Sequence, residues 1–221
     1  MEQKLSKEKI IQIAFDILAE KRTIEGLSMR NLATALDVKA PAIYWYFKDK
    51  QDLLQNMAET MEQQLQVPDS ALTAMEQLSA FMSAYYDLYT QFPCGAELEI
   101  NTVPAYASRL EHIEAMNQLV YQQGYSLAQS RHAVLSLHYL LIGYLIDRQK
   151  EEQLAQKIRT GNQSLQQSVQ WMRQYAQEQA LESFRFALSQ REQELDTKET
   201  FMNSVKIYLL GLEQLKNDFS S

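Results

Sequence analysis

The stretch GLSMRNLATALDVKAPAIYWYFKDKQDLL, which runs from Gly26 to Leu54, decides the fold of this chain. Its first half carries apolar residues at helical spacing, and Ser28 stands where a helix would begin. A break follows at Asp37, a residue type that accepts a left-handed backbone better than most. Pro41 then opens a second helix, because proline is well tolerated in a first helical turn. Two short helices joined by a tight turn predict a helix-turn-helix unit.

The second of these helices contains four consecutive aromatic residues, YWYF. An α-helix has 3.6 residues per turn, so Ile43 and Phe47 share the buried face while Trp45 points away from it. Tyr44 is lateral and Tyr46 is borderline. A large aromatic residue on a solvent face needs a partner, and the second helix of such a unit normally lies in the DNA major groove. Packing against the next helix or against a partner chain is the alternative.

Helical periodicity continues through most of the remaining chain. A helix over 6–21, capped by Ser6, precedes the unit, and Asp49 with Asp52 begins a helix that runs to Val67. Residues 147–168 are rich in charges and glutamines, and we interpret them as a frayed helix end and a mobile loop. The other predicted helices are 39–47, 70–90, 95–102, 105–123 and 126–152, followed by helical stretches after residue 169 and across 201–215.

These patterns predict an all-α fold of about nine to ten helices. A three-helix, helix-turn-helix domain is expected over residues 1–50 and a larger helical domain over 51–221, with 51–67 as the connecting helix. The composition agrees, because 221 residues at 46% hydrophobic can bury a large core. Only six glycines and four prolines interrupt a chain dominated by helix-forming residues.

The sequence favours a cytoplasmic protein. Cys94 is the single cysteine, which rules out an internal disulfide and fits a reducing compartment. The first ten residues, MEQKLSKEKI, are polar and charged, so we expect no secretory signal. No segment approaches the ~18 uninterrupted apolar residues of a membrane span, and we expect no membrane partner.

The net charge of −7 is unevenly distributed. Residues 1–52 contain nine Lys and Arg residues against eight Asp and Glu residues, so the acidic excess lies in the rest of the chain. This asymmetry is expected where only the N-terminal part approaches a polyanion such as DNA.

The sequence offers no catalytic centre, and we expect a protein that is not an enzyme. Cys94 has no evident histidine partner, and His112, His132 and His138 share no metal-ligand spacing. We also find no paired carboxylates and no phosphate-binding loop. An enzyme is therefore the weakest alternative, and a ligand-independent architectural DNA-binding protein is the other. Such a DNA-binding protein would not need so large a second domain.

The quoted stretch resembles the DNA-binding signature of the TetR family of bacterial repressors, in which a Leu-[Ser/Thr]-x-Arg start, a Leu-Ala pair, a tight turn, an aromatic run and a Lys-x-Lys-x-x-Leu-Leu end occur in this order. Asp37 departs from the glycine that is usual in the turn. The resemblance implies that double-stranded operator DNA is a partner. It assigns the following residues to bases or phosphates: Ser28, Arg30, Ala40, Pro41, Ala42, Tyr44, Trp45, Tyr46 and Lys50.

The second domain resembles the tetracycline-repressor branch of that family. The stretch YQQGYSLAQSRHAVLSLHYLLIGYLIDRQ is similar to the branch's long dimerisation helix, and FMNSVKIYLLGLEQLK is similar to its last helix. In that branch the two helices pair with their mates in a homodimer. The last helix also has apolar residues at alternating spacings of four and three, which suits helix packing. Packing within one chain is the alternative. The implied dimerisation residues are Leu137, Leu141, Tyr144, Phe201, Val205, Tyr208 and Leu212.

The drug-contacting positions of that branch are altered. Glu99 stands where the branch has a metal-ligating histidine, and most polar tetracycline contacts are replaced. We expect a pocket for a small, largely apolar effector, and a cationic effector is one option because aromatic rings and a carboxylate attract positive charge. Plain core packing is the alternative for each residue. The expected effector contacts are Gln66, Phe81, Tyr85, Tyr89, Glu97, Glu99, Thr102, Val103, Pro104, Met116, Val120, Val134, Tyr139 and Asp147.

We expect no cofactor. Glu99, Thr102 and Asp147 could offer oxygen ligands to a divalent ion that accompanies the effector, but the histidine of the branch is missing. As a mechanism we expect that a bound effector displaces the 53–67 helix. The two recognition helices of the dimer would then no longer fit successive major grooves of DNA.

Overall fold

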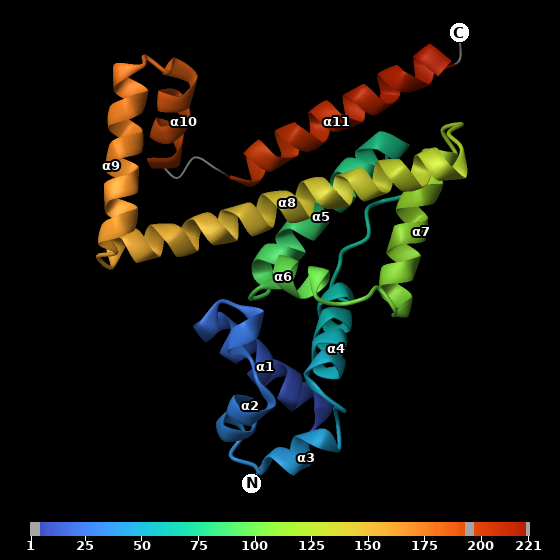
Figure 1. Cartoon of the computed structure of the whole chain (residues 1–221). Coiled ribbons are helices and arrows are strands. Elements are labelled where there is room, and N and C mark those ends of the chain that lie inside the picture. Colours follow the sequence, from blue (N-terminus) through green and yellow to red (C-terminus); the bar gives the residue numbers. More distant parts are fainter. Residues whose placement is uncertain (1–4, 193–196, 220–221) are drawn as a thin grey trace.

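The computed structural model describes residues 5–192 and 197–219, and every regular element in these ranges is helical (Figure 1). The predicted all-α fold is confirmed, with eleven α-helices and one short 3-10 helix in the described chain. The elements are α1 (Lys7–Lys21), η1 (Ile24–Gly26), α2 (Met29–Ala35), α3 (Ala40–Tyr44), α4 (Lys50–Glu62), α5 (Ala74–Gln91), α6 (Gly95–Ile100), α7 (Ala107–Tyr121), α8 (Leu127–Arg159), α9 (Gln163–Glu178), α10 (Glu182–Glu192) and α11 (Lys198–Phe219).

The first three α-helices form the expected helix-turn-helix unit at one end of the molecule (Figure 1). Ser6 caps α1 by accepting a hydrogen bond from the backbone N–H of Lys9 at 3.2 Å. Leu18, Leu32 and Ile43, one from each helix, are completely buried in a common core. Because apolar side chains of all three helices meet there, the unit holds α2 and α3 in a fixed relative position.

The helix α4 carries the chain from this unit into the body. Asp49 caps it as predicted, by accepting a hydrogen bond from the backbone N–H of Asp52 at 2.8 Å. The helix packs against α1 near its start and against α6 and α7 in the body. It ends at Glu62 rather than at Val67, because the chain tightens there: the backbone N–H of Leu65 bonds to the carbonyl oxygen of Glu62, only three residues back.

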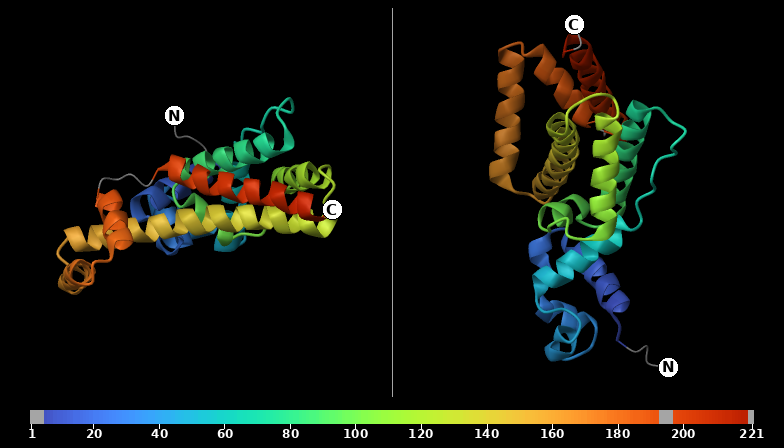
Figure 2. Two further views of the ribbon diagram at one scale, coloured as in Figure 1. Left: turned by 90° about the horizontal axis from the view of Figure 1, so that it is seen from above. Right: turned by 90° about the vertical axis from the view of Figure 1, so that its right-hand side faces the viewer.

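The body is built on α5, α7, α8 and α11, which pack against one another. The longest helix, α8, has 33 residues and crosses the whole body, and α11 lies beside it (Figures 1 and 2). Ser126 caps α8 as expected, since its hydroxyl accepts from the backbone N–H of Gln129 at 3.2 Å. The short α6 lies under α8, on the side that faces the N-terminal unit (Figure 1). No helix in the described ranges is long and apolar enough to cross a bilayer.

The predicted loop over 147–168 is wrong, because this segment is almost entirely helical. The helix α8 continues to Arg159, and α9 begins at Gln163. Glutamine, glutamate, lysine and alanine favour helix even without an apolar stripe. The side-chain amides of Gln149 and Gln153 also donate to the carbonyl oxygen of Arg22, at 3.3 and 3.2 Å, and so hold α8 against the end of α1. Beyond this point α9 and α10 form an antiparallel pair (Figure 1).

The predicted dimerisation stripe faces the interior of its own chain. Phe201 and Val205 are completely buried, and the Phe201 ring centroid lies 5.3 Å from those of Tyr86 and Tyr144. Periodicity shows that one face of a helix is covered but not what covers it, and here packing within the chain is correct. The residues that packing within the chain buries are Leu137, Leu141, Phe201, Val205 and Leu212. Tyr144 and Tyr208 are half-buried and their hydroxyls donate to backbone carbonyl oxygens, and a dimer contact of these two residues stays a prediction.

Candidate functional site

The turn between α2 and α3 places α3 at the outer end of the N-terminal unit (Figure 1). Asp37 has φ 53°, which is the left-handed conformation expected for this break. The backbone N–H of Val38 bonds to the carbonyl oxygen of Ala33 at 3.0 Å and so closes the end of α2. Lys39 then begins α3 in an extended conformation, with Pro41 in the first turn.

The aromatic residues of α3 divide between core and solvent as the helical spacing predicts. Ile43 and Phe47 are 0% and 1% exposed, whereas Trp45 is 88% exposed and Tyr44 is 50% exposed. The small residues of the same helix leave the backbone accessible: Pro41 is exposed, and Ala40 and Ala42 are partly exposed. The result is a protruding aromatic surface with room for close approach, which suits the major groove of DNA.

Other predicted DNA contacts already have partners inside the protein. The Ser28 hydroxyl caps α2 by accepting from the backbone N–H of Asn31 at 3.2 Å. The Tyr46 hydroxyl donates to the carbonyl oxygen of Leu5 at 2.8 Å. The Lys50 ammonium donates to the carbonyl oxygen of Ile24 at 2.6 Å.

These three side chains therefore stabilise the unit, and their contact with phosphates stays a prediction. Arg30 is exposed on α2, where phosphate or base contact likewise stays a prediction.

A cavity of about 440 Å³ lies in the body, where residues of α5, α6, α7 and α8 meet. Its size is that of a site for a small molecule. Most of its wall is apolar, and the polar side chains come from α6, α7, α8 and the segment after α6. The wall contains Met82, Tyr85, Tyr89, Glu99, Ile100, Thr102, Pro104, Arg109, Ile113, Met116, Asn117, Arg131, Val134, Leu135, His138 and Leu141.

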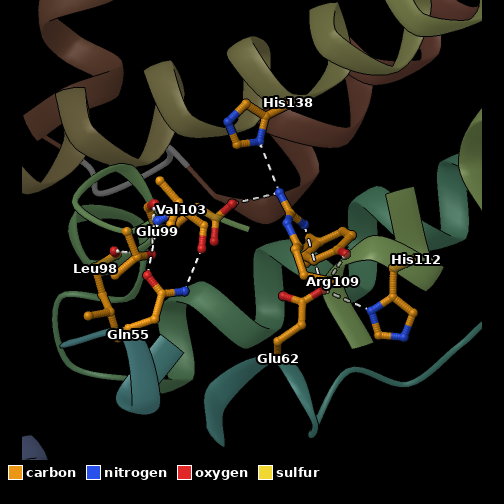
Figure 3. Close-up of polar contacts among 10 residues, drawn as sticks. Gln55, Glu62, Leu98, Glu99, Val103, Arg109, His112 and His138 are labelled. Atoms are coloured by element: carbon orange, nitrogen blue, oxygen red, sulfur yellow. Dashed lines mark hydrogen bonds and ion pairs between the residues drawn. The ribbon is translucent and has the colours of Figure 1, made fainter. Parts of the chain in front are cut away.

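A buried ion cluster forms one side of this cavity (Figure 3). The guanidinium of Arg109 lies 2.6 Å from a carboxylate oxygen of Glu99 and 3.6 Å from one of Glu62. The same Glu62 oxygen accepts from the Tyr85 hydroxyl at 2.6 Å and lies 2.8 Å from Nδ1 of His112. The arginine and both glutamates are at most 9% exposed. This cluster therefore connects three helices, α4, α6 and α7. In the low-dielectric interior each charge is stabilised by its partner, and an unpaired charge would be strongly unfavourable.

The protonation states of the cluster follow from burial and from its neighbours. Burial raises the pKa of Glu99, while the Arg109 cation opposes this rise. Burial lowers the pKa of Arg109, but the nearby tyrosines and glutamates more than compensate, and the guanidinium stays charged. Burial and then the Arg109 cation lower the pKa of His138 to about 4, so this imidazole is neutral at physiological pH.

The N-terminal unit matches a known family. Residues 15–57 match the family described as "Bacterial regulatory proteins, tetR family". This N-terminal unit is a DNA-binding domain of the tetR family. Tetracycline repressor protein class C of Escherichia coli is 28% identical over 155 residues, which cover 67% of this chain and 68% of that protein. The chain is accordingly a transcriptional regulator with a DNA-binding domain, and it is not an enzyme.

Solved structures of other regulators share the fold of this chain. A variant of TetR from Acinetobacter baumannii AYE, in complex with minocycline, has a TM-score of 0.67 and 18% identity, and the likeness covers 96% of this chain and 98% of that chain. BioQ with its double-stranded DNA operator has a TM-score of 0.61 and 27% identity, over 75% of this chain and 98% of that chain.

Part of the predicted effector site lines the cavity, and part lies elsewhere. The predicted residues in the wall are Tyr85, Tyr89, Glu99, Thr102, Pro104, Met116 and Val134. Those outside it are Phe81 and Val120, which are buried in the core, Gln66, Val103, Tyr139 and Asp147, which are exposed, and Glu97, which bonds to the backbone N–H of Ile24 instead.

Four of the residues outside the wall differ from wall residues by one or two positions in sequence: Phe81, Glu97, Val103 and Tyr139. His138 lines the cavity, whereas its neighbour Tyr139 is 64% exposed. Because one residue along an α-helix turns the side chain by about 100°, an assignment that is one position off selects the wrong face. Glu97 and Glu99 likewise point to different sides of α6. The resemblance thus selected helices that line the cavity but not always the face that lines it.

Sequence reasoning missed the polar wall of the cavity, although one signal was present. Arg109, Ile113, Met116 and Val120 follow one another at spacings of four, three and four residues in α7. This pattern places an arginine on the same face as three apolar residues. A charged residue in such a stripe is expected to be buried with a partner. The other missed polar residues, Asn117, Arg131 and His138, gave no comparable signal.

The wall does not suit a divalent metal ion. Glu99 is already paired with Arg109, whose positive charge would repel a second cation, and Asp147 lies outside the wall. Within the described ranges, no group of three or more His, Cys, Asp and Glu side chains is arranged to hold a metal. We therefore derive no step of the mechanism from a metal ion.

The free energy of unfolding is expected to rise as the pH increases from about 4 to about 6.5, in part through His138. Its pKa is lower in the folded state, so the unfolded chain binds the proton more tightly in this window. His138→Gln should reduce the rise by roughly 1 kcal/mol, allowing for partial solvent access. Urea denaturation at several pH values measures it. His132→Gln, at an exposed position of α8, is the control, and equal slopes in both variants would contradict the assignment.

Proposed function

We propose that this tetR-family regulator is a homodimeric repressor that binds operator DNA through α3 and releases it when a small molecule enters the cavity. Residues 1–50 form the DNA-binding domain in this proposal, and residues 51–221 bind the effector and the second subunit. The protein would work in the cytoplasm, where its operator is. One observation supports it most strongly: the segments that carry wall residues are hydrogen-bonded to the DNA-binding unit and to α4, the helix that leaves it.

The first of these connections runs through α4. The side-chain amide of Gln55 both donates to the carbonyl oxygen of Val103 and accepts from its backbone N–H (Figure 3). Gln51, one turn earlier on α4, donates to the carbonyl oxygen of Asn101 at 2.8 Å. Thr102 and Pro104 of the same segment line the cavity. A ligand that moves this segment would therefore pull on two side chains of the helix that enters the DNA-binding unit.

The second connection runs through α6. Glu97 accepts from the backbone N–H of Ile24 at 3.3 Å and from the side-chain amide of Gln149 at 3.0 Å. Two residues later on the same helix, Glu99 meets Arg109 at the cavity. A shift of α6 would thus move or break the hydrogen bonds of Glu97 to η1, which follows α1, and to α8. Since both connections end in the N-terminal unit, a ligand could change the spacing of two recognition helices in a dimer.

A DNA-binding assay tests the proposal. Purified protein, mixed with fragments of the genome from which it comes, should retain a small set of fragments that contain a palindromic sequence. Retention should weaken steeply as salt is raised, since phosphate contacts dominate affinity. Compounds are then screened for release of the retained fragment. Failure to enrich any fragment would overturn the proposal, whereas enrichment without release by any compound would favour the architectural alternative.

The dimer in this proposal uses the outward faces of α8 and α11. Ile207, Leu210 and Leu215 on α11 are 73%, 55% and 50% exposed, and Tyr139 on α8 is 64% exposed. These two helices lie side by side (Figure 2), and in this proposal their exposed apolar side chains contribute to one surface. Contiguous exposed apolar residues of this kind mark association sites in soluble proteins.

Leu210→Glu is expected to convert the protein to folded monomers, because it places a charge in the proposed interface. Sedimentation velocity measures the mass, and circular dichroism measures helix content, which should not change. Val67→Glu, a substitution at an exposed residue outside both helices, is the control and should leave the dimer intact. A Leu210→Glu protein that sediments like the wild type would contradict this choice of surface.

A further inference from the structure

The buried polar atoms of the cavity wall include two hydrogen-bond donors that lack an acceptor, beside one acceptor, Oδ1 of Asn117, that lacks a donor. Nε of Arg109 and the hydroxyl of Tyr89 are inaccessible to solvent and have no hydrogen-bond partner at bonding distance in the described chain, although the Tyr89 hydroxyl lies close enough to Glu99 to lower the pKa of that carboxyl. The two residues are only 5% and 4% exposed, and both line the cavity. A buried polar group without a partner costs about 1–3 kcal/mol. A ligand that shifts these two side chains toward the cavity and offers them an acceptor would recover that free energy.

The imidazole of His138 adds a further donor. Its Nδ1 lies 3.4 Å from Nη2 of Arg109. A guanidinium can only donate, so Nδ1 is the acceptor and the proton of the neutral ring is on the other nitrogen. His138 lines the cavity, and its N–H adds to the donors of Arg109 and Tyr89.

The charges of the wall do not favour a cation. The Glu99 carboxylate is committed to Arg109, and Glu62 is committed to Tyr85 and His112. Arg131 lies at the exposed part of the wall and forms no ion pair with the described residues. An entering cation would therefore meet two guanidinium groups, and the one carboxylate oxygen of the cluster without a hydrogen-bond partner, Oε2 of Glu62, belongs to a residue outside the wall. The option of a cationic effector, which depended on Glu97 or Glu99 as an anchor, is no longer favoured.

We infer that the effector is a largely apolar molecule with an anionic or strongly accepting head group, such as a carboxylate, phenolate or enolate. The head group accepts hydrogen bonds from Arg109 and Tyr89 and is attracted by Arg131, while the apolar part packs on Met82, Met116 and similar residues. This inference deepens the proposed function, since it depends on the cavity being the effector site.

Three probes that differ only in their head group test the inference. They are three anthracene derivatives, which carry a carboxylate, a hydroxymethyl group or an ammoniomethyl group at the same carbon of the central ring. Fluorescence titration of the full-length protein near neutral pH gives the dissociation constants. The carboxylate is expected to bind at least tenfold more tightly than the ammonium, with the alcohol between them. Equal binding of the two, tighter binding of the ammonium, or no binding of the carboxylate would overturn the inference.

Matched variants locate the effect in the wall. Tyr89→Phe removes only the unpartnered hydroxyl and is expected to weaken carboxylate binding roughly tenfold. Tyr106→Phe is its control, because the Tyr106 hydroxyl is also buried without a partner in the described chain but is not in the wall. Arg131→Gln should weaken carboxylate binding several-fold and leave the alcohol unchanged. Arg185→Gln, on the exposed face of α10, removes the same charge elsewhere and should change neither.

Operator binding is measured on the same proteins, and it distinguishes a failure of the head-group inference from a failure of the proposed repressor function. Wild type and all four variants are expected to retain the operator fragment, because none of the changes lies in α2 or α3. If they retain the operator fragment and the probes show no preference for the carboxylate, the head-group inference is wrong but the proposed function as a DNA-binding repressor is not affected. Failure of the wild type to bind DNA would instead count against the proposed function.

Discussion

Replacing Arg109 with leucine is expected to lower the free energy of unfolding by about 3–5 kcal/mol. The substitution removes the only cation that lies against both Glu62 and Glu99 in the described chain, and leaves two carboxylates in a site that is almost closed to water. A buried charge without a partner costs far more than the pair itself contributes. Since most domains are stable by only ~5–15 kcal/mol, this single change removes a large part of the total.

Urea denaturation followed by circular dichroism measures the effect. Arg185→Leu, which removes an exposed arginine from α10, is the matched control and should stay within about 0.5 kcal/mol of the wild type. The triple change Arg109→Leu with Glu62→Gln and Glu99→Gln should recover part of the loss, because no uncompensated charge remains. A loss of less than about 1 kcal/mol for Arg109→Leu would mean that water or an alternative partner reaches the two carboxylates.

Local sequence signals predicted the helix starts well. Ser6, Asp49 and Ser126 cap α1, α4 and α8 as expected, because a side-chain oxygen at such a position can bond only to the nearby backbone. The break at Asp37 was predicted for the same kind of reason, since a positive φ is a property of one residue. Features that depend on a few neighbouring residues can be deduced from the sequence.

The errors concern features that depend on distant residues. The segment from 147 to 168 has few apolar residues, yet its helix is held by two glutamines that reach the end of α1, more than 120 residues away in sequence. The stripe of α11 was correctly identified as buried, but its partners, Tyr86 and Tyr144, belong to α5 and α8. Periodicity gives the buried face of a helix, whereas the fold decides which element covers it.

The candidate site shows the same limit. Its apolar wall was partly predicted because aromatic and methionine residues recur at helical spacing and resemble a known pocket. Its polar wall requires Glu62, Glu99 and Arg109 to converge from three helices, and no local pattern relates them. The preferred charge of the effector changed for this reason. The carboxylate of Glu99, which the sequence offered as a contact for a cation, forms an ion pair in the structure with Arg109, ten positions away in sequence.

Replacing Trp45 with alanine is expected to weaken operator binding about 100-fold or more while leaving the fold intact. The indole is 88% exposed, so it contributes little to the core and its loss should change stability by less than about 0.5 kcal/mol. An exposed aromatic residue at the centre of an interface commonly contributes ~2 kcal/mol or more, and each subunit of the proposed dimer would lose one. Gel-shift titration with the operator fragment measures the affinity.

Two further substitutions separate DNA contact from loss of structure. Tyr44→Ala, at the 50% exposed neighbour, should also weaken operator binding without unfolding the unit. Phe47→Ala should weaken it for a different reason, because this ring is 1% exposed and its removal costs about 3–5 kcal/mol of stability. Thermal melting distinguishes the two cases. If Trp45→Ala binds the operator like the wild type and melts at the same temperature, α3 does not read DNA with its outward face, and the aromatic surface has another partner.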